Sequence, residues 1–348
     1  MKKINLNKYF QKPKKNLNLK PLIIAEISAN HGGSKKKFLN LIKSAKKNGA
    51  DLIKIQTYEA KDITIRNTRV GKLDLWNLYS KAKTPLSWHN EAFKLARKLQ
   101  ITLFSTPFSV RAVQFLEKCN VKLYKISSFE ITDFLLIDAI AKTKKPIILS
   151  TGMASLNEIK AAIRCIKKYH SKITILHCVS GYPTKVENIN LSRLIMMKKI
   201  FKDFNIGLSD HTNDINSSIA SCCLGATMVE KHYILSKADK SYDKDFSINP
   251  EQLKELSVFS NIIHKNLFNQ KNYNKVFNNK GEDHSKSFRR SIFLTKNIKK
   301  GEKITLSNVS TYRPSVGIKS ENIFKVIGKN INKNKKKNQP LRYNDLVK

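Results

Sequence analysis

Short apolar runs rich in β-branched residues recur along this chain, and a stretch with helical spacing of apolar residues follows each of them. The helical spacing is clear at Phe38, Leu41, Ile42 and Ala45. Eight such units follow one another, and their near-continuous apolar strands indicate parallel pairing with both faces buried. The predicted strands are residues 22–28, 52–58, 102–107, 123–128, 146–152, 173–181, 205–210 and 228–235.

Eight strand–helix units over about 250 residues are typical of the closed (β/α)8 TIM barrel. A doubly wound open sheet is the alternative, but no GxGxxG motif follows the first strand to favour it. We therefore predict an α/β fold with a TIM barrel over residues 1–268. Residues 59–87 form a long insertion in the second unit, and in a barrel they would extend the mouth.

The pattern changes after the last predicted helix. Residues 269–286 are rich in Asn and Lys and poor in apolar residues, which indicates a linker. From residue 287 to residue 348, short predicted strands alternate with turns such as Lys300-Gly301-Glu302. We expect a small second domain there, with only a modest core of its own.

The chain carries 66 Lys and Arg against 26 Asp and Glu, a formal net charge of +40. A charge of this size can mark nucleic-acid binding. However, the lysines are spread over the whole chain, and aromatic residues are not interleaved with basic clusters as a stacking surface requires. We therefore predict no nucleic acid as the main partner, and expect the charge to attract small anions such as phosphorylated substrates.

No apolar run approaches the roughly 20 residues that a membrane span needs, so we expect no membrane partner. The first 20 residues are basic and polar, without the apolar segment of a secretory signal. The five cysteines show no CxxC spacing and lie in apolar segments, which predicts reduced, buried thiols in a cytoplasmic protein. They are Cys119, Cys165, Cys178, Cys222 and Cys223.

Polar residues stand near the ends of the predicted strands, where a barrel places its catalytic groups. Lys54 and Lys125 lie inside otherwise apolar strands, which is costly unless they are paired or face a ligand, so we predict a functional role for both. Nearby hydroxyl groups can hold phosphate or carboxylate oxygens. For Thr106 and Ser150 a helix N-cap is an equally good interpretation.

Two histidines, His211 and His232, end neighbouring predicted strands, with Asp210 and Glu230 close in sequence. Such a pair can hold a divalent metal in an open site, which suits chemistry on oxygen-rich, anionic substrates. His31 lies on a loop after the first strand, where it could contact substrate. His177 is predicted to be a core histidine, and the surface histidines are predicted to be His89, His170, His264 and His284.

Taken together, these residues resemble the sialic acid synthase family. The motifs that carry the resemblance run in the family's order along nearly the whole chain, at residues 24–31, 54–58, 104–108, 124–126 with 128, 148–153, 209–212 and 230–232. Residues 288–291, 312–314 and Gly317 resemble the family's C-terminal SAF (antifreeze-like, β-clip) domain. Residues 54–58, 78–89 and 127–130 are most similar to the branch that makes pseudaminic acid.

The resemblance implies a transferase that joins phosphoenolpyruvate to the open-chain aldehyde of an N-acylated amino sugar, with release of phosphate. For the pseudaminate branch the sugar is 2,4-diacetamido-2,4,6-trideoxy-L-altrose. The alternative is an N-acetylneuraminate or legionaminate synthase, which uses N-acetylmannosamine or its 2,4-diacetamido-6-deoxy analogue. It further implies a divalent metal on His211 and His232, Mn²⁺ in preference to Mg²⁺ or Co²⁺.

The resemblance also implies roles for further residues. Glu26 would act with the two histidines in catalysis, by transferring a proton or by holding a sugar hydroxyl. Arg313 would reach the active site of the other subunit of a domain-swapped homodimer and contact the N-acyl group. The implied substrate-binding residues are Lys54, Gln56, Thr106, Lys125, Ser128, Ser150, Tyr182, Ser209, Asp243, Phe288 and Arg313.

Two other hypotheses remain open at the level of sequence. A Schiff-base aldolase would use Lys54 or Lys125 as a nucleophile without a metal. An ice- or glycan-binding module would place the function in the C-terminal domain. The complete set of polar residues at the strand ends argues against the second.

Overall fold

A computed structural model of the chain describes residues 5–13, 19–268 and 280–347. It divides into two compact units, Met1–Asn269 and Gln270–Lys348, each with its own hydrophobic core. In the part of the chain that is described, no helix combines the length and apolarity that crossing a bilayer requires.

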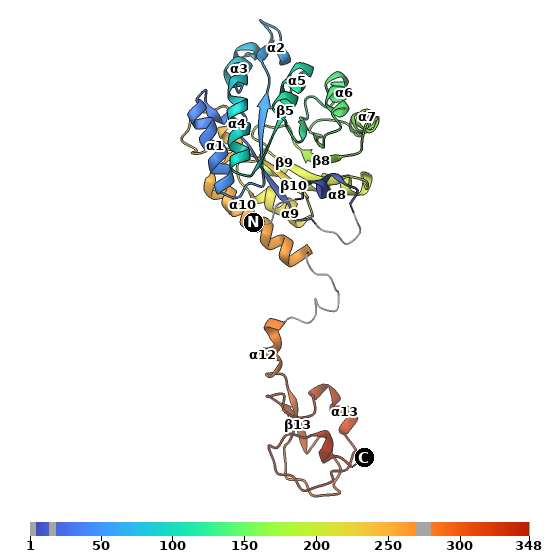
Figure 1. The fold of residues 1–348 in the computed structure, drawn as a ribbon. Helices are drawn as coiled ribbons and strands as arrows, with labels where there is room; N and C mark the ends of the chain where they lie inside the picture. Colours follow the sequence, from blue (N-terminus) through green and yellow to red (C-terminus); the bar gives the residue numbers. More distant parts are fainter. Residues whose placement is uncertain (1–4, 14–18, 269–279, 348) are drawn as a thin grey trace. The chain divides into compact units, whose positions relative to one another are not determined.

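The first unit is a closed barrel of parallel strands, as predicted (Figure 1). The sheet closes because β1 pairs with β10, in a register that runs from Leu22↔Met228 to Glu26↔His232. Strands β5 and β9 have the predicted bounds, the other six are shorter than predicted, and a short strand β11 (Ser247–Ile248) adds to β10. The barrel strands are β1 (Leu22–Glu26), β2 (Leu52–Thr57), β5 (Thr102–Pro107), β6 (Tyr124–Ile126), β7 (Ile147–Ser150), β8 (Ile173–Cys178), β9 (Asn205–Asp210) and β10 (Met228–Tyr233).

A helix follows every barrel strand and covers its outer face (Figure 1). In the first of them the apolar residues Phe38, Leu41, Ile42 and Ala45 are buried, as their spacing predicts, and the hydroxyl of Ser34 caps the helix by accepting from Lys37 N. The helices are α1 (Lys35–Lys47), α4 (Leu86–Lys98), α5 (Val110–Lys118), α6 (Phe134–Lys142), α7 (Leu156–Lys167), α8 (Leu191–Ile200), α9 (Asn216–Cys223) and α10 (Pro250–Ile263).

Additional segments supplement the strands and helices of the barrel. At the amino-terminal end of the strands, the short helix η1 (Leu6–Phe10) buries Tyr9 and Phe10. The carbonyl of Tyr9 accepts hydrogen bonds from Thr174 Oγ1 at 2.6 Å and Asn205 Nδ2 at 2.8 Å. The predicted insertion after β2 consists of α2 (Ala60–Ile63), β3 (Arg69–Val70), β4 (Leu73–Asp74) and α3 (Leu75–Ala82). Short elements elsewhere in the unit are η2 (Ser28–His31), η3 (Val186–Asn188), η4 (Lys244–Phe246) and the π-helix η5 (His264–Phe268).

The second unit is small and built around an antiparallel pair of strands, β12 and β13. Its core includes Ile292, Leu294, Ile304 and Leu341. The predicted linker lies outside the described residues over 269–279, and the rest of it, residues 280–286, forms helical turns instead. The elements are η6 (Lys280–Glu282), α12 (Asp283–Lys286), β12 (Ser291–Leu294), β13 (Val309–Tyr312), η7 (Ser320–Asn322), α13 (Ile323–Val326) and η8 (Tyr343–Asp345).

Candidate active site

The carboxyl ends of the barrel strands bring together most of the polar residues that the sequence analysis selects. Because all eight strands are parallel, their carboxyl ends form one rim, and side chains at these ends converge. The selected side chains on the barrel strands and in the loops after them are almost all buried, although most of them are polar or charged. The buried ones are Glu26, Lys54, Thr106, Lys125, Ser128, Ser150, Ser209, His211 and His232.

Two lysines and two glutamates form a buried charge cluster at the centre of this rim. Lys54 Nζ lies 3.0 Å from Glu26 Oε2 and 3.4 Å from Glu230 Oε1. Lys125 Nζ donates to the same Glu230 oxygen at 3.1 Å, and so does Ser209 Oγ at 3.0 Å. Glu230 therefore links the strands β2, β6 and β9 through one carboxylate.

Nearby carboxylates do not balance the charges of the two lysines equally. Burial lowers the pKa of both, but Glu230 and Glu26 together outweigh it at Lys54, whose pKa is raised. At Lys125 burial prevails over Glu230, and the charge of Lys54 adds to it, so the pKa of Lys125 is lowered. Burial would raise the pKa of Glu230, yet the two lysines hold it well below its usual range. Lys125 thus lacks part of its negative counter-charge, which an anionic ligand would supply.

Hydroxyl groups surround the charge cluster. Thr106 Oγ1 accepts from Lys54 Nζ at 3.4 Å, and Ser128 Oγ lies 2.9 Å from Ser180 Oγ. Ser150 Oγ is buried and has no hydrogen-bond partner in the described structure, so it is available to a ligand. The N-cap interpretation of Thr106 and Ser150 is wrong, because Ser109 and Ser155 cap the two helices that follow.

Gly152 is required for the close packing of the loop after β7. Its φ is +44°, and a Cβ at this position would lie 2.4 Å from Ser128 Cβ and 2.5 Å from Ser180 Oγ. Any larger residue would therefore displace the two serine side chains. The guanidinium of Arg193 holds the same loop from the outside by donating to Gly152 O at 3.1 Å and Ala154 O at 3.0 Å.

The two predicted metal-binding histidines lie next to each other, with ring centroids 5.5 Å apart. His211 Nδ1 donates to the carbonyl of Val179 at 2.9 Å, so its Nε2 keeps a free lone pair. Burial, reinforced by His232, lowers the pKa of His211 to about 3, which keeps the ring neutral at pH 7. His232 Nδ1 lies 3.5 Å from Asp243 Oδ2.

These features fit a divalent metal ion with few protein ligands. Neutral imidazoles are the form that binds metals, and an acceptor behind one ring nitrogen orients the other. Within residues 5–13, 19–268 and 280–347, no group of three or more His, Cys, Asp and Glu side chains is arranged to hold a metal. His211 and His232 would therefore be the protein ligands, with the other positions left to water and substrate oxygens.

Three further predicted residues lie around the histidines and the lysines. Asp243 Oδ2 accepts from the Ala29 backbone at 3.1 Å, and although burial would raise its pKa, His232 and these hydrogen bonds lower it. The half-exposed ring of Tyr182 packs on His211 with centroids 4.4 Å apart. Gln56 lies on β2, paired in register with Thr106.

Phe288 and Arg313 belong to the second unit, where both side chains are exposed. Phe288 makes an edge-to-face contact with His284 at 5.4 Å between ring centroids. The contact of both residues with substrate stays a prediction.

Two other sequence-based predictions, those for His89 and Cys223, are wrong, whereas the contact of His31 with substrate stays a prediction. The ring of His31 is buried in edge-to-face contact with Phe38 and Trp88. His89, predicted to be a surface group, is fully buried, and its Nε2 is 2.8 Å from Thr57 Oγ1. Cys223 is exposed, whereas the other four cysteines are buried. In each case the helix packing of the barrel, which local sequence does not encode, decides the exposure.

Two glutamates at the rim were not assigned a role from sequence. Glu230 would have been found by the rule that selected Lys54, because it too is a charge inside an apolar strand. Glu130 follows β6 and accepts from the hydroxyl of Ser127. Burial raises the pKa of Glu130 to about 7, against the opposing effect of Lys125, so it changes protonation state near neutral pH. Its position in a loop gave no signal.

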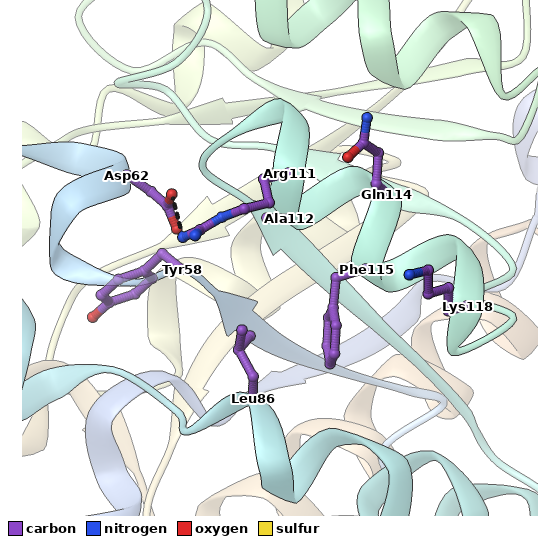
Figure 2. Close-up of a pocket in the computed structure, with 8 residues that line it drawn as sticks. All are labelled: Tyr58, Asp62, Leu86, Arg111, Ala112, Gln114, Phe115 and Lys118. Carbon is purple, nitrogen blue, oxygen red and sulfur yellow. Dashed lines mark hydrogen bonds and ion pairs between the residues drawn. The ribbon is translucent and has the colours of Figure 1, made fainter.

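A separate pocket of about 250 Å³ lies on the flank of the barrel (Figure 2). Its wall contains the ion pair between Arg111 and Asp62, which are 2.9 Å apart, and the aromatic rings of Tyr58 and Phe115 (Figure 2). None of the predicted site residues lines it, so we assign it no part in the chemistry of the rim.

Comparison with protein families gives two matches that together cover most of the chain. The NeuB family model matches residues 41–272, and the SAF domain model matches residues 289–347.

Similar proteins point to the same chemistry. The pseudaminic acid synthase of Helicobacter pylori is 39% identical over 340 residues, which cover 94% of this chain and 98% of that protein. The N,N'-diacetyllegionaminic acid synthase of Campylobacter jejuni is 35% identical over 344 residues, covering 93% and 99%. The crystal structure of the N-acetylneuraminic acid synthetase of Leptospira borgpetersenii, in complex with citrate, matches with a TM-score of 0.70 and 30% identity, over 79% of this chain and 94% of that one.

Proposed function

The chain belongs to the NeuB family, and from this membership and the geometry of the barrel rim we propose that it catalyses the pseudaminic acid synthase reaction. In this reaction phosphoenolpyruvate, 2,4-diacetamido-2,4,6-trideoxy-L-altrose and water give pseudaminate and phosphate. The similarity to the H. pylori enzyme supports the choice of sugar. The second candidate is the legionaminate or N-acetylneuraminate reaction, which the similarity to the C. jejuni and L. borgpetersenii proteins supports.

The observation that carries the reaction class is the cluster in which Glu230 joins Lys54 and Lys125 beside His211 and His232. Phosphoenolpyruvate has a phosphate and a carboxylate, and two ammonium groups at one rim match this pair of anions. The hydroxyls of Thr106, Ser128, Ser150 and Ser209, with the phenol of Tyr182, would complete the anion-binding site.

The reaction forms one carbon–carbon bond and breaks one carbon–oxygen bond. The methylene carbon of phosphoenolpyruvate attacks the aldehyde carbon of the open-chain sugar. The oxygen of water adds to the carbon that carries the phosphate, and phosphate leaves with its bridging oxygen. One proton of water is retained on the former aldehyde oxygen, and the other leaves with phosphate. The keto group of the product thus takes its oxygen from water.

The proposed role of Glu26 follows from its surroundings. Its carboxylate is fully buried, and apart from the ion pair with Lys54 neither oxygen has a hydrogen-bond partner in the described structure. Such a group can accept a proton, or it can accept a hydrogen bond from a sugar hydroxyl. Asp243 and Gln56 would bind the sugar beside it.

A divalent cation, in our proposal Mn²⁺ with Mg²⁺ or Co²⁺ as substitutes, would be held by His211 and His232. When bound there, it supplies Lewis-acid chemistry that polarises the aldehyde carbonyl and orients the attacking water. The lone pair on His211 Nε2 and the carboxylate behind His232 support this assignment.

The test is phosphate release from phosphoenolpyruvate in the presence of Mn²⁺, with three sugars in parallel. These are the altrose derivative, the corresponding mannose derivative and N-acetylmannosamine, each with an EDTA control. We expect turnover with the altrose derivative, and its loss in EDTA. Turnover with another sugar only would overturn the choice of sugar. Turnover that resists EDTA, with trapping of a Lys125 adduct by borohydride, would instead favour a Schiff-base aldolase, for which the lowered pKa of Lys125 is the one supporting feature.

We further propose that the enzyme is a domain-swapped homodimer in which Phe288 and Arg313 of one subunit complete the site of the other. The exposure of both residues supports this arrangement. Arg313→Ala and His232→Ala variants should each be nearly inactive at low sugar concentration. Mixing them by unfolding and refolding should restore roughly a quarter of the parental activity, because half of the dimers then hold one intact site. Activity no higher than that of the separate variants would exclude sharing across the dimer.

A further inference from the structure

A second buried ion pair lies behind the rim, on the outer side of the barrel wall. Lys231 Nζ is 3.2 Å from Asp210 Oδ2, and both side chains are completely buried. Asp210 ends β9, and Lys231 is its partner in register on β10. The pair lies between these strands and helix α9, because Ser218 of α9 donates to Asp210 Oδ2 at 2.6 Å.

All polar atoms of this pair have partners. Asp210 Oδ1 accepts from the backbone N–H and from the hydroxyl of Thr212, both at 2.8 Å. Lys231 Nζ also donates to Thr212 Oγ1 at 3.1 Å and to the Thr212 carbonyl. Burial would raise the pKa of Asp210, but Lys231, Ser218 and Thr212 lower it, so the carboxylate is charged. Burial lowers the pKa of Lys231, against the opposing effect of Asp210.

Along β9 and β10, the ion pair lies between residues of the charge cluster and the two histidines. One residue before it, Ser209 and Glu230 face inward and are joined by a hydrogen bond of 3.0 Å. One residue after it come His211 and His232. The ladder between β9 and β10 ends at Lys231↔Asp210, so no backbone pairing between the two strands continues to the histidines. His232 is also paired with Glu26 of β1 and Ser247 of β11, whereas on the side of β9 the last pair that fixes the spacing of the two histidines is Asp210 and Lys231.

The energetics of a buried ion pair argue for a role other than stability. The cost of removing two charges from water is comparable to the attraction gained, and apolar side chains of the same shape are often as stabilising. The helix layer of a barrel is normally apolar, so a fully bonded pair here acts on geometry more than on the free energy of unfolding. We infer that Asp210 and Lys231 are positioning residues that set the spacing of His211 and His232, and with it the affinity for the divalent cation; this rests on the proposed function.

The experiment removes both charges and keeps the shapes, in the double variant Asp210→Asn with Lys231→Met. Binding of Mn²⁺ is measured by electron paramagnetic resonance of the free ion, together with the midpoint of thermal unfolding. We expect a melting midpoint within about 4 °C of the parent. We also expect Mn²⁺ affinity to fall about tenfold or more, as for other groups that orient metal ligands.

A matched control uses the ion pair Lys20–Asp51, with 3.2 Å between Nζ and Oδ1, at the opposite end of the barrel. The variant Lys20→Met with Asp51→Asn should keep the parental Mn²⁺ affinity. A folded Asp210/Lys231 double variant with parental affinity would overturn the inference, and so would an equal loss of affinity in the control.

If the double variant does not fold, Ser218→Ala decides the question. It removes only one hydroxyl from the pair, and we expect a loss of Mn²⁺ affinity of about two- to fivefold; unchanged affinity would contradict the inference. The turnover of the parent with phosphoenolpyruvate and sugar is measured separately. A parent that turns over without binding Mn²⁺ refutes the positioning role and leaves the reaction in place, whereas one that binds Mn²⁺ without turnover refutes only the reaction.

Discussion

Replacing His232 or His211 with alanine should lower kcat for phosphate release by about a thousandfold or more. Each imidazole is one of only two protein ligands that we propose for the cation, so its loss removes the Lewis acid from the aldehyde. Because both rings are buried against Phe246, with the His232 and Phe246 centroids 4.8 Å apart, truncation leaves the wall of the site otherwise intact. Saturating both substrates in the assay ensures that kcat, not affinity, is compared.

The loss of turnover must be accompanied by the loss of Mn²⁺ binding, measured on the same protein by titration. His170→Ala is the control, since His170 is a partly buried histidine of the same unit whose Nδ1 accepts from Lys172 N, away from the proposed site residues. It should retain parental kcat and Mn²⁺ affinity. Parental turnover in either His211→Ala or His232→Ala would refute the assignment of the metal site.

Replacing Lys125 with methionine should lower kcat/KM for phosphoenolpyruvate by about a hundredfold or more. The substitution keeps the length of the side chain and removes the ammonium group whose counter-charge is incomplete in the free protein. Glu230 keeps Lys54 at 3.4 Å and Ser209 at 3.0 Å, so its charge is not left isolated and the fold should survive.

The KM for the sugar distinguishes a lost anion contact from a general collapse of the site. It should change little in Lys125→Met, because the proposed sugar-binding residues lie on other strands. Lys122→Met provides the matched control, since Lys122 is an exposed lysine just before the same strand, and its Nζ donates to Asn120 Oδ1. Equal effects of the two substitutions, or an unchanged kcat/KM in Lys125→Met, would exclude the proposed phosphoenolpyruvate contact.

The sequence alone was sufficient for the architecture and for grouping many of the candidate site residues at one rim. The alternation of apolar runs and amphipathic stretches is a local property, and it predicts the eight strand–helix units that the structure contains. Parallel strands in a closed barrel share one rim, so residues such as Lys54 and Lys125 could be placed together without any knowledge of distances. Charges inside apolar strands are rare enough to mark that rim.

The tertiary structure decided which of these groups contact one another. Lys125 and Glu230 are 105 residues apart in the sequence, and they meet only because the barrel closes. The alternation of a strand places Glu230 and Lys231 on opposite faces of β10, and the tertiary structure decides that Glu230 meets Lys125 at the rim while Lys231 meets Asp210 beneath helix α9. From sequence, the hydroxyls of Thr106 and Ser150 could equally be helix N-caps. The structure excludes that role, because Ser109 and Ser155 cap the two helices that follow.

Periodicity is a property of neighbouring residues, and it therefore determined the order and kind of the elements. The burial of a side chain, its ion-pair partners and its pKa depend on atoms from distant segments. These properties could therefore be read only from the closed barrel. His89 is the plainest case, since its sequence surroundings are those of a surface helix, yet it is fully buried and hydrogen-bonded to Thr57 of β2. The same reasoning predicts a surface position for His170, which is partly buried, so the packing of α4 on the barrel decides that His89 is buried completely.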